Sequence, residues 1–246
     1  MSERDDVFSD PARISRDFHF GDDVARVFDD MVSRSIPFYA ELQRMTVDLA
    51  RSFMKDGTTV YDLGCATGTT LRELAVDGRD RDIQFIGVDN SKAMLDRAGD
   101  KLAAAGCLER CDLELADLDT VRVHNASVIV LILTLQFIRP PRREMLIRRL
   151  SEGLVDDGAL VLVEKTISGD PFLNRIFIDH YHDFKKRNGY SELEVAQKRD
   201  ALENVLVPYR LDENKELLRS NGFDTVEVFF RWYNFAGLVA VKRTRA

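Results

Sequence analysis

The sequence lacks the features that mark a secreted, membrane-bound or disulfide-stapled protein. It has three cysteines, Cys65, Cys107 and Cys111, and no C-x-x-C pair, so neither a disulfide framework nor a zinc site is indicated and we expect reduced thiols. No run approaches the roughly 18 consecutive apolar residues of a membrane span. The segment from Met1 to Asp6 is too charged for a signal peptide. We therefore expect a soluble, cytoplasmic protein that does not contact a membrane.

Basic charge is also scarce, since the net charge is -7. A large surface for direct nucleic-acid binding normally needs a basic face, and the best candidate here is Arg142-Arg143 with Arg148-Arg149. These arginines alternate with apolar positions, so we interpret them as a solvated helix face. His180 and His182 suggest a metal site, but alternate positions in a helix point to different sides, and we predict no metal.

The order of predicted elements indicates an α/β fold. Strands at 58–63, 83–88, 112–116, 127–133 and 158–164 alternate with helices, as in a doubly wound, mostly parallel sheet. Two more strands follow near the end of the chain. Only the short Tyr233-Asn234 link joins them, so they must form an antiparallel hairpin and complete a seven-stranded sheet.

With 246 residues and 45% apolar content, the chain is expected to form a single domain over 1–246. Its first twenty or so residues are polar and suggest a loosely held arm, and a break at Asn188-Gly189 divides two helices between 170 and 206. The predicted parts are a helical cap (1–56), an α/β core that binds a cofactor (57–165), a helical insertion (166–210), and a helix with the terminal hairpin (211–246).

The most informative motif runs from Val60 to Gly68 and joins an apolar strand to a turn with the spacing G-x-x-x-G, which includes Gly64, Cys65 and Ala66. A phosphate-binding turn has G-x-G-x-x-G, whereas here Asp62 lies two residues before the first glycine and would repel pyrophosphate. The motif favours a cationic, phosphate-free cofactor, although any strand, turn and helix of an α/β protein is the simpler alternative.

Two further acids follow strands. Asp89, with Asn90, ends the second strand and can accept hydrogen bonds from a ribose diol, or can merely join the cap of the next helix. Asp117 follows the third strand and can accept from an adenine amino group while the Leu118 backbone N–H meets a ring nitrogen; a turn residue is the equal alternative. Acids at the tips of consecutive strands together indicate a nucleoside site.

Tyr39 lies in the first turn of a predicted helix, where its ring can cover a cofactor and its phenol can donate to a carboxylate; the alternative is a core residue packed against Phe38. Arg199 falls among Val195 and Leu202 on one helix face. A guanidinium in such a stripe needs an anion or a route to water, so Arg199 either clamps a carboxylate ligand or pairs with a protein acid.

With these motifs in view, the sequence resembles the carboxy-S-adenosyl-L-methionine synthases, a family in the class I methyltransferase superfamily. The resemblance extends over almost the whole chain and is most specific in the insertion. It is carried by Arg4-Asp5, Val7–Ser9, Val27-Phe28, Pro37, Tyr39, Val60–Cys65, Asp89–Ser91, Thr134–Phe137, Gly158–Lys165, His182–Lys185, Asn188–Glu194, Gln197–Arg199 and Leu202–Val205.

The resemblance implies a homodimeric enzyme that converts S-adenosyl-L-methionine and prephenate to carboxy-S-adenosyl-L-methionine and phenylpyruvate. The product would supply a separate enzyme that carboxymethylates the wobble uridine of tRNA. It also implies that Arg199 reaches the new carboxylate from the neighbouring subunit. The remaining cofactor contacts would come from Tyr39, Gly64, Cys65, Ala66, Asp89, Asn90, Asp117 and Leu118; no side chain is assigned as acid or base.

Two positions depart from the family pattern. Ile132 stands where an asparagine is common, and Ala66 replaces a frequent serine. The alternatives are an ordinary small-molecule methyltransferase that kept the insertion and a cofactor-binding adaptor without catalysis.

Overall fold

The computed structural model describes residues 3–10 and 18–243. Its helices are α1 (Asp22–Ser35), α2 (Tyr39–Phe53), α3 (Thr69–Asp77), α4 (Lys92–Ala104), α5 (Pro140–Gly153), α6 (Pro171–Arg187), α7 (Glu192–Leu202) and α8 (Leu211–Ser220). Its strands are β1 (Thr58–Leu63), β2 (Ile83–Asp89), β3 (Cys111–Leu115), β4 (Ala126–Ile132), β5 (Leu154–Ile167), β6 (Tyr209–Arg210), β7 (Thr225–Trp232) and β8 (Phe235–Val241).

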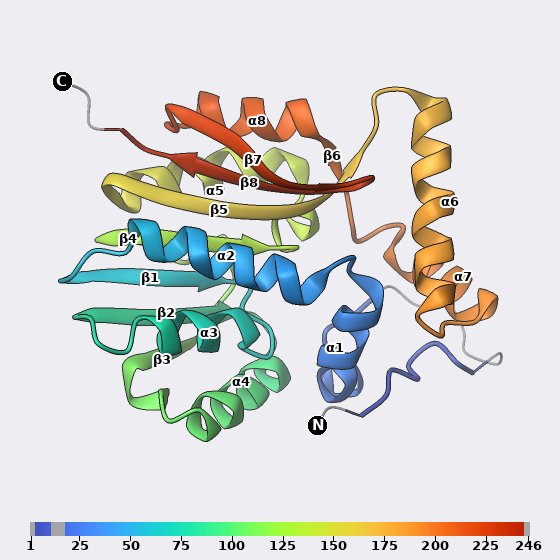
Figure 1. Cartoon of the computed structure of the whole chain (residues 1–246), viewed down its shortest axis with the longest axis horizontal. Coiled ribbons are helices and arrows are strands. Elements are labelled where there is room, and N and C mark those ends of the chain that lie inside the picture. The colour runs from blue at the N-terminus through green and yellow to red at the C-terminus, as the bar shows by residue number, and fades with distance from the viewer. Residues whose placement is uncertain (1–2, 11–17, 244–246) are drawn as a thin grey trace.

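The strands form one sheet in the order β3-β2-β1-β4-β5-β8-β7, and Figure 1 shows them side by side, with β3 at the bottom and β7 at the top. From β3 to β5 all neighbouring strands are parallel, and β8 pairs antiparallel with both β5 and β7. The predicted fold is confirmed, including the terminal hairpin. Within the described residues, the two-residue strand β6 adds an eighth member beside the end of β5.

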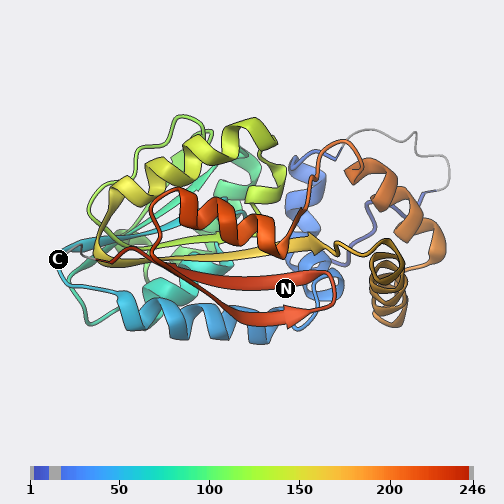
Figure 2. The ribbon, with the colours of Figure 1, turned by 90° about the horizontal axis from the view of Figure 1, so that it is seen from above.

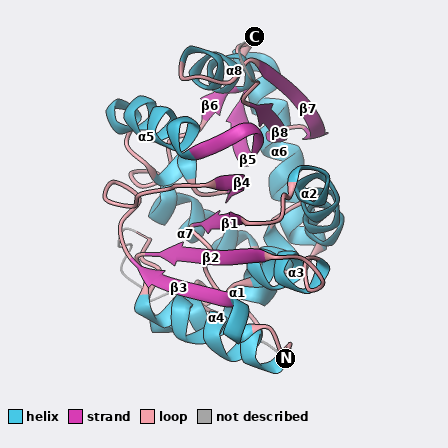
Figure 3. Ribbon diagram, turned by 90° about the vertical axis from the view of Figure 1, so that its left-hand side faces the viewer, coloured by secondary structure: helices cyan, strands magenta, loops and turns pink. Residues whose placement is uncertain are grey.

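Helices cover both faces of the sheet: α5 and α8 lie on one face, and α2 and α3 on the other (Figure 3). The central strands are therefore mostly buried; in β4 every residue but the last is buried. Two clusters of buried side chains form the core, one containing Leu146 and Leu218 and the other containing Leu71 and Phe85. This core holds the ends of the parallel strands in fixed positions.

Helices α1, α6 and α7 gather beyond one end of the sheet (Figures 1 and 2). Between α6 and α7 the chain reverses at Gly189, whose φ of 86° is a left-handed conformation that favours glycine. The predicted break between two insertion helices is confirmed. These helices enclose the end of the sheet where the functional residues lie.

The prediction of a loosely held N-terminal arm is wrong for the residues that the structure describes. Val7 and Phe8 are buried with side chains of α1, and Phe8 stacks on Phe18. The Asp5 carboxylate accepts a hydrogen bond of 2.5 Å from the hydroxyl of Tyr190, which lies between α6 and α7. The prediction failed because the segment is polar on average, whereas a few apolar side chains, Val7 and Phe8 among them, hold it in place. Part of the predicted arm, residues 11–17, lies outside the described residues.

Candidate substrate-binding site

A cavity of about 1030 Å³ lies at the carboxyl ends of the parallel strands. Its floor includes residues that end β1, β2, β4 and β5, and its walls come from α1, α2, α6 and α7. This is where ligands bind in open parallel sheets, because loops diverge from the strand ends there. Every residue predicted to bind the cofactor borders this cavity: Tyr39, Gly64, Cys65, Ala66, Asp89, Asn90, Asp117, Leu118 and Arg199.

The turn after β1 requires both of its glycines. Gly64 has a φ of 77°, and a Cβ there would lie 2.4 Å from the hydroxyl oxygen of Thr134. Gly68 has a φ of 72°, and its Cβ would lie 2.9 Å from that of Ala98. These glycines allow left-handed backbone and close packing against neighbouring elements.

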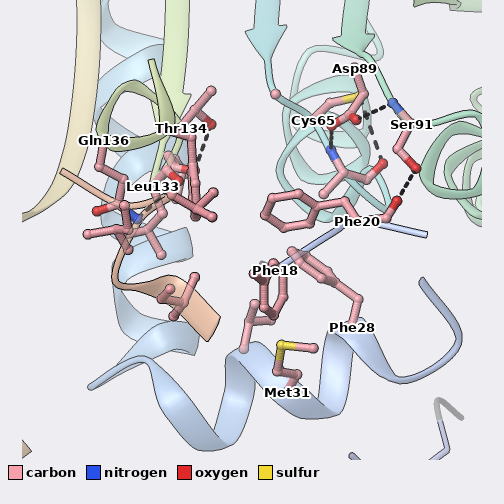
Figure 4. A pocket seen from close by; sticks show the side chains of 18 of the residues that line it. Phe18, Phe20, Phe28, Met31, Cys65, Asp89, Ser91, Leu133, Thr134 and Gln136 are labelled. Atoms are coloured by element: carbon pink, nitrogen blue, oxygen red, sulfur yellow. Dashed lines mark hydrogen bonds between the residues drawn. The ribbon is translucent and has the colours of Figure 1, made fainter. Parts of the chain in front are cut away.

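Asp89 ties the glycine turn to the start of α4. Its carboxylate accepts hydrogen bonds of 2.9 Å from the backbone N–H groups of Ala66 and Ser91 (Figure 4). Burial raises the pKa of this carboxyl above its usual value. The cap of α4 is the Ser91 hydroxyl, which accepts from the N–H of Met94. Asp89 thus joins the cap through the Ser91 N–H, as the alternative predicted, and its carboxylate still keeps lone pairs for a diol.

Asp62 is the most deeply buried acid of the cavity floor, with 2% of its surface exposed. Its Oδ2 atom has no hydrogen-bond partner, and burial raises the pKa of its carboxyl to about 7. A buried carboxylate without a cationic partner is costly, and a cationic ligand above it would favour the ionised form. The donor set and this unpaired oxygen fit a sulfonium and ammonium compound.

The third acid, Asp117, forms a turn: its Oδ1 atom accepts from the N–H of Asp119 at 2.9 Å. The turn alternative is therefore present in the structure. Leu118 beside it is buried, and the guanidinium of Arg149 donates to its carbonyl oxygen at 2.5 Å. This bond holds the loop at the mouth of the cavity, so a role for Asp117 and Leu118 with an adenine ring stays a prediction.

An aromatic wall, which the sequence reasoning missed, faces the glycine turn. Phe18, Phe20, Phe28 and Met31 gather opposite Asp89 (Figure 4). Phe20 is fixed in place because its carbonyl oxygen accepts from the Ser91 hydroxyl at 2.5 Å. Aromatic side chains beside polar acceptors suit a nucleoside, whose base is flat and whose ribose is polar. The sequence feature that could have revealed this wall is the presence of Phe18 and Phe20 within a polar segment.

Tyr39 borders the cavity, and burial raises the pKa of its phenol above its usual value, as does the negative charge of Asp29. Phe38 is 61% exposed, so the alternative of a shared core with Tyr39 is wrong. Helix α1 is locked over the glycine turn, because Thr67 and Lys101 both donate to the Asp29 carboxylate at 2.6 and 2.9 Å. These contacts give the cavity a fixed roof.

Arg199 does not lie within an apolar stripe of the single chain. Its side chain is 62% exposed and forms an ion pair of 2.9 Å with Asp200. Lys198 is the buried cation of α7, with its ammonium 3.2 Å from the Ser35 hydroxyl and 3.8 Å from the Asp5 carboxylate. The expected position of Arg199 within an apolar stripe is therefore wrong for the single chain, because Val195, Lys198 and Ala201 form the buried face of α7. Its role toward a ligand stays a prediction.

The cavity has a basic end, formed by β5, α6 and α7. Lys165, His182, Lys185 and Lys198 border it together with Arg199. The pKa of His182 is lowered by burial and by the charges of Lys185, Lys165 and Arg199, so these groups lie within electrostatic reach of one another. The cavity thus has acids beneath the glycine turn and bases at the insertion, an arrangement that suits a cation beside an anion.

Arg143 corrects the interpretation of the arginine pairs as a solvated face. It is 1% exposed, and its guanidinium donates to the carbonyl oxygens of Ile138, Val207 and Gln136 at 2.8, 2.6 and 3.3 Å. The chain after α7 folds back over this side of α5, which no local pattern predicts. Arg143 therefore braces two segments of the cavity wall.

The remaining candidates behave differently. His180 stacks on Tyr233, whereas His182 lies beside Tyr181, and within residues 3–10 and 18–243 no group of three His, Cys, Asp or Glu side chains could hold a metal ion. All three cysteines are free and buried. Ile132 ends β4 and borders the cavity, so an apolar surface replaces an amide there. No helix in the described part of the chain is both long and apolar enough to span a bilayer.

Fold and cavity together define a class I methyltransferase-type protein. A family model described as a methyltransferase domain matches residues 60–158. An O-methyltransferase family 2 protein from Planctomyces limnophilus superimposes with a TM-score of 0.60 at 16% identity, covering 87% of this chain and 61% of that one. The solved chain is thus longer than this one, and the likeness shows the fold alone.

The full length of the chain matches more specific relatives. A carboxy-S-adenosyl-L-methionine synthase from Methylococcus capsulatus is 52% identical over 240 residues, covering 97% of this chain and 99% of the relative. One from Desulfotalea psychrophila is 45% identical over 240 residues, covering 98% of each. The chain belongs to the carboxy-S-adenosyl-L-methionine synthase family, and the predicted enzyme class is confirmed.

Proposed function

We propose that this protein converts S-adenosyl-L-methionine and prephenate to carboxy-S-adenosyl-L-methionine and phenylpyruvate. The observation that carries the proposal, beside family membership, is the polarity of the cavity. Asp62 and Asp89 lie at the end suited to the sulfonium nucleoside, and Lys165 and Lys185 lie at the other. An ordinary methyl acceptor needs no such group of bases, whereas a dicarboxylate donor does.

The reaction balances without an added oxidant or metal. Loss of the ring carboxylate of prephenate as carbon dioxide makes the ring aromatic and expels its hydroxyl group as hydroxide. Hydroxide removes a proton from the S-methyl group, which the sulfonium charge acidifies, and forms water. The resulting ylide carbon bonds to carbon dioxide. The chain's task is to hold both substrates together and exclude bulk water, which the aromatic wall and the roof of α1 favour.

We propose that S-adenosyl-L-methionine binds as a substrate through the predicted residues. Asp89 would accept from the ribose diol and Asp117 from the adenine amino group, while Asp62 would attract the cationic centres. Tyr39 lies in the first turn of α2, where its phenol would donate to the ligand's carboxylate. The aromatic wall would cover the nucleoside.

The exposed position of Arg199 supports a homodimer in which each protomer completes the other's site. A guanidinium that is 62% exposed contributes little to carboxylate binding until a second surface removes it from water. The insertion also exposes apolar side chains, Phe172 at 73%, Leu173 at 44% and Leu193 at 40%. A second copy of the chain would cover these side chains and bring Arg199 to the new carboxylate.

We propose that the protein acts in the cytoplasm, where it supplies carboxy-S-adenosyl-L-methionine. The product would serve a separate enzyme that carboxymethylates wobble uridine in tRNA, and this chain would not bind the nucleic acid itself. Its net charge of -7 favours a role on a small molecule rather than on a polyanion.

Mass spectrometry of the purified protein incubated with S-adenosyl-L-methionine and prephenate tests the proposal. We expect a nucleoside product heavier by one carbon dioxide, with phenylpyruvate in equal amount. Formation of S-adenosylhomocysteine and a methylated acceptor would instead identify an ordinary methyltransferase. Binding of S-adenosyl-L-methionine without turnover of prephenate would identify an adaptor.

A further inference from the structure

Two lysines at the basic end of the cavity lack an acceptor of their own. Lys185 is 4% exposed and Lys165 is partly buried. Among the residues that the structure describes, no carboxylate lies within ion-pairing distance of either ammonium group, and no hydrogen bond from either is formed. Both lysines border the cavity, and an ammonium group held away from bulk water without an acceptor is costly, so the pair indicates a site for an anionic ligand.

What the two lysines share is the ring of Tyr181. The ammonium of Lys165 lies 5.0 Å from the ring centroid and that of Lys185 lies 4.4 Å from it. The ring is buried and packs edge-on against Phe235, with centroids 5.1 Å apart. The attraction of one ring face for two cations does not offset the cost of burying two like charges together.

The acids nearest in the sequence or fold are already engaged. Glu164 precedes Lys165, but its Oε1 atom accepts from the backbone N–H of Leu135 at 2.9 Å, and successive strand residues point to opposite faces. The Asp5 carboxylate is bound to Tyr190 and Lys198. Lys198 therefore serves as a link between the N-terminal segment and α7, and it is not part of the unpaired set.

In the protein alone, the charged forms of both lysines are disfavoured. Burial lowers the pKa of Lys165 to about 8. Burial lowers the pKa of Lys185 well below its usual value, and the charges of Lys198 and Lys165 add to this shift. A carboxylate placed between the two ammonium groups would reverse the effect, because an opposite charge within about 4 to 6 Å favours the charged form.

We propose that Lys165 and Lys185 form an anion subsite for the 2-oxo carboxylate of the carboxyl donor, the group that remains on the released product. The inference rests on the proposed function. Prephenate carries two carboxylates: one leaves as carbon dioxide and becomes the group assigned to Arg199, and the other stays on phenylpyruvate. A second cationic contact, apart from Arg199, is what a donor of this kind needs.

The test compares Lys165→Met and Lys185→Met with Lys186→Met. Methionine keeps the length and apolar part of the side chain but removes the charge. Lys186 is the matched control, because it is the next residue on α6 yet is exposed and pairs with Asp183 at 2.9 Å. For each variant the Kd for S-adenosyl-L-methionine, the KM for prephenate and the inhibition constant of phenylpyruvate are measured.

We expect each cavity variant to raise the KM for prephenate and the inhibition constant of phenylpyruvate by the same factor, roughly 30-fold or more. The Kd for S-adenosyl-L-methionine and for carboxy-S-adenosyl-L-methionine should remain at the wild-type value, in contrast to Arg199→Ala. Lys186→Met should behave as wild type. Lys185→Arg, which keeps the charge, should recover part of the prephenate affinity and also serves if Lys185→Met does not fold.

Unchanged prephenate and phenylpyruvate constants in variants that still bind S-adenosyl-L-methionine overturn the subsite. If wild-type protein does not turn over prephenate but binds phenylpyruvate in a manner that depends on both lysines, the proposed reaction fails and the anion subsite stands. If wild-type protein binds neither acid, measured by calorimetry in the presence of S-adenosyl-L-methionine, the subsite is overturned as well.

Discussion

The buried acid beneath the glycine turn predicts that S-adenosyl-L-methionine binds more tightly as the pH rises toward neutrality. The pKa of Asp62 in the free protein is raised to about 7 by burial. A cationic centre about 4.5 Å away, at an effective dielectric constant of about 20, would favour the carboxylate by about 4 kcal/mol, or roughly three pKa units. The bound state would then hold Asp62 ionised at pH values where the free state holds it protonated.

The size of the effect follows from the ionised fraction. That fraction rises from about 3% at pH 5.5 to about 50% at pH 7, so the affinity should rise about 16-fold across this interval. The ligand confounds the measurement little, because an α-amino group with a pKa of about 7.7 to 8.0 is still more than about 80% charged at pH 7. Calorimetry in two buffers of different ionisation enthalpy should show close to one proton released per ligand at pH 5.5 and about half at pH 7.

Asp62→Asn should remove most of this pH dependence. The matched control is Asp96→Asn, which removes an exposed acid that also borders the cavity and pairs with Lys92. Any dependence of the affinity on pH that remains in Asp62→Asn at acidic pH is assigned to Asp89, because burial also raises the pKa of that carboxyl. A wild-type affinity that stays flat from pH 5.5 to 7 would refute the reasoning, because it would mean that no buried acid ionises when the ligand binds.

Three further predictions concern charged side chains. Arg199→Ala should weaken binding of carboxy-S-adenosyl-L-methionine by about 2 to 5 kcal/mol, and of S-adenosyl-L-methionine much less; equal losses by calorimetry would contradict the proposed role. Arg143→Met should lower the free energy of unfolding in urea by about 3 kcal/mol, since three carbonyl oxygens lose their donor, and Arg142→Met, on the exposed side of α5, by well under 1 kcal/mol; similar values would contradict the bracing role. Burial raises the pKa of Glu164 to about 8 from 4.5, so its contribution to stability is complete below about pH 4.5 and is lost as the pH rises through about 8. The melting temperature of wild type should therefore fall relative to Glu164→Gln over that interval, and parallel curves would show that Glu164 is not protonated in the fold.

The central sheet could be predicted because its signals are local. Apolar runs such as β1 and turns such as Gly64 to Gly68 depend on residues close together in the sequence, and the strand bounds agree closely with the structure. Strand β5 is the exception, since it begins at Leu154, four residues before the expected start at 158. There a register shift in its pairing with β4 lengthens the strand, and no sequence pattern reports such an irregularity.

The floor of the cavity was predicted more completely than its walls, where only Tyr39 and Arg199 were anticipated. The acids at the strand tips follow from the topology, because parallel strands bring their carboxyl ends to one edge. The walls depend on tertiary contacts between distant segments. Lys185 and Arg143 look like surface residues by composition, and only the docking of α6 and of the 203–208 segment buries them. The face of α7 was misjudged because its neighbours, rather than its own apolar pattern, decide which cation is inside.

The bond between Asp5 and Tyr190 joins residues that are 185 positions apart. During synthesis this bond therefore forms only after nearly four-fifths of the polypeptide has been made. Val7 and Phe8 have partners earlier, because they pack against side chains of α1, but until α6 and α7 are made the cavity lacks one wall. The cavity is thus completed late in synthesis. A bulky fusion at the amino terminus would weaken substrate binding before it lowers the stability of the sheet.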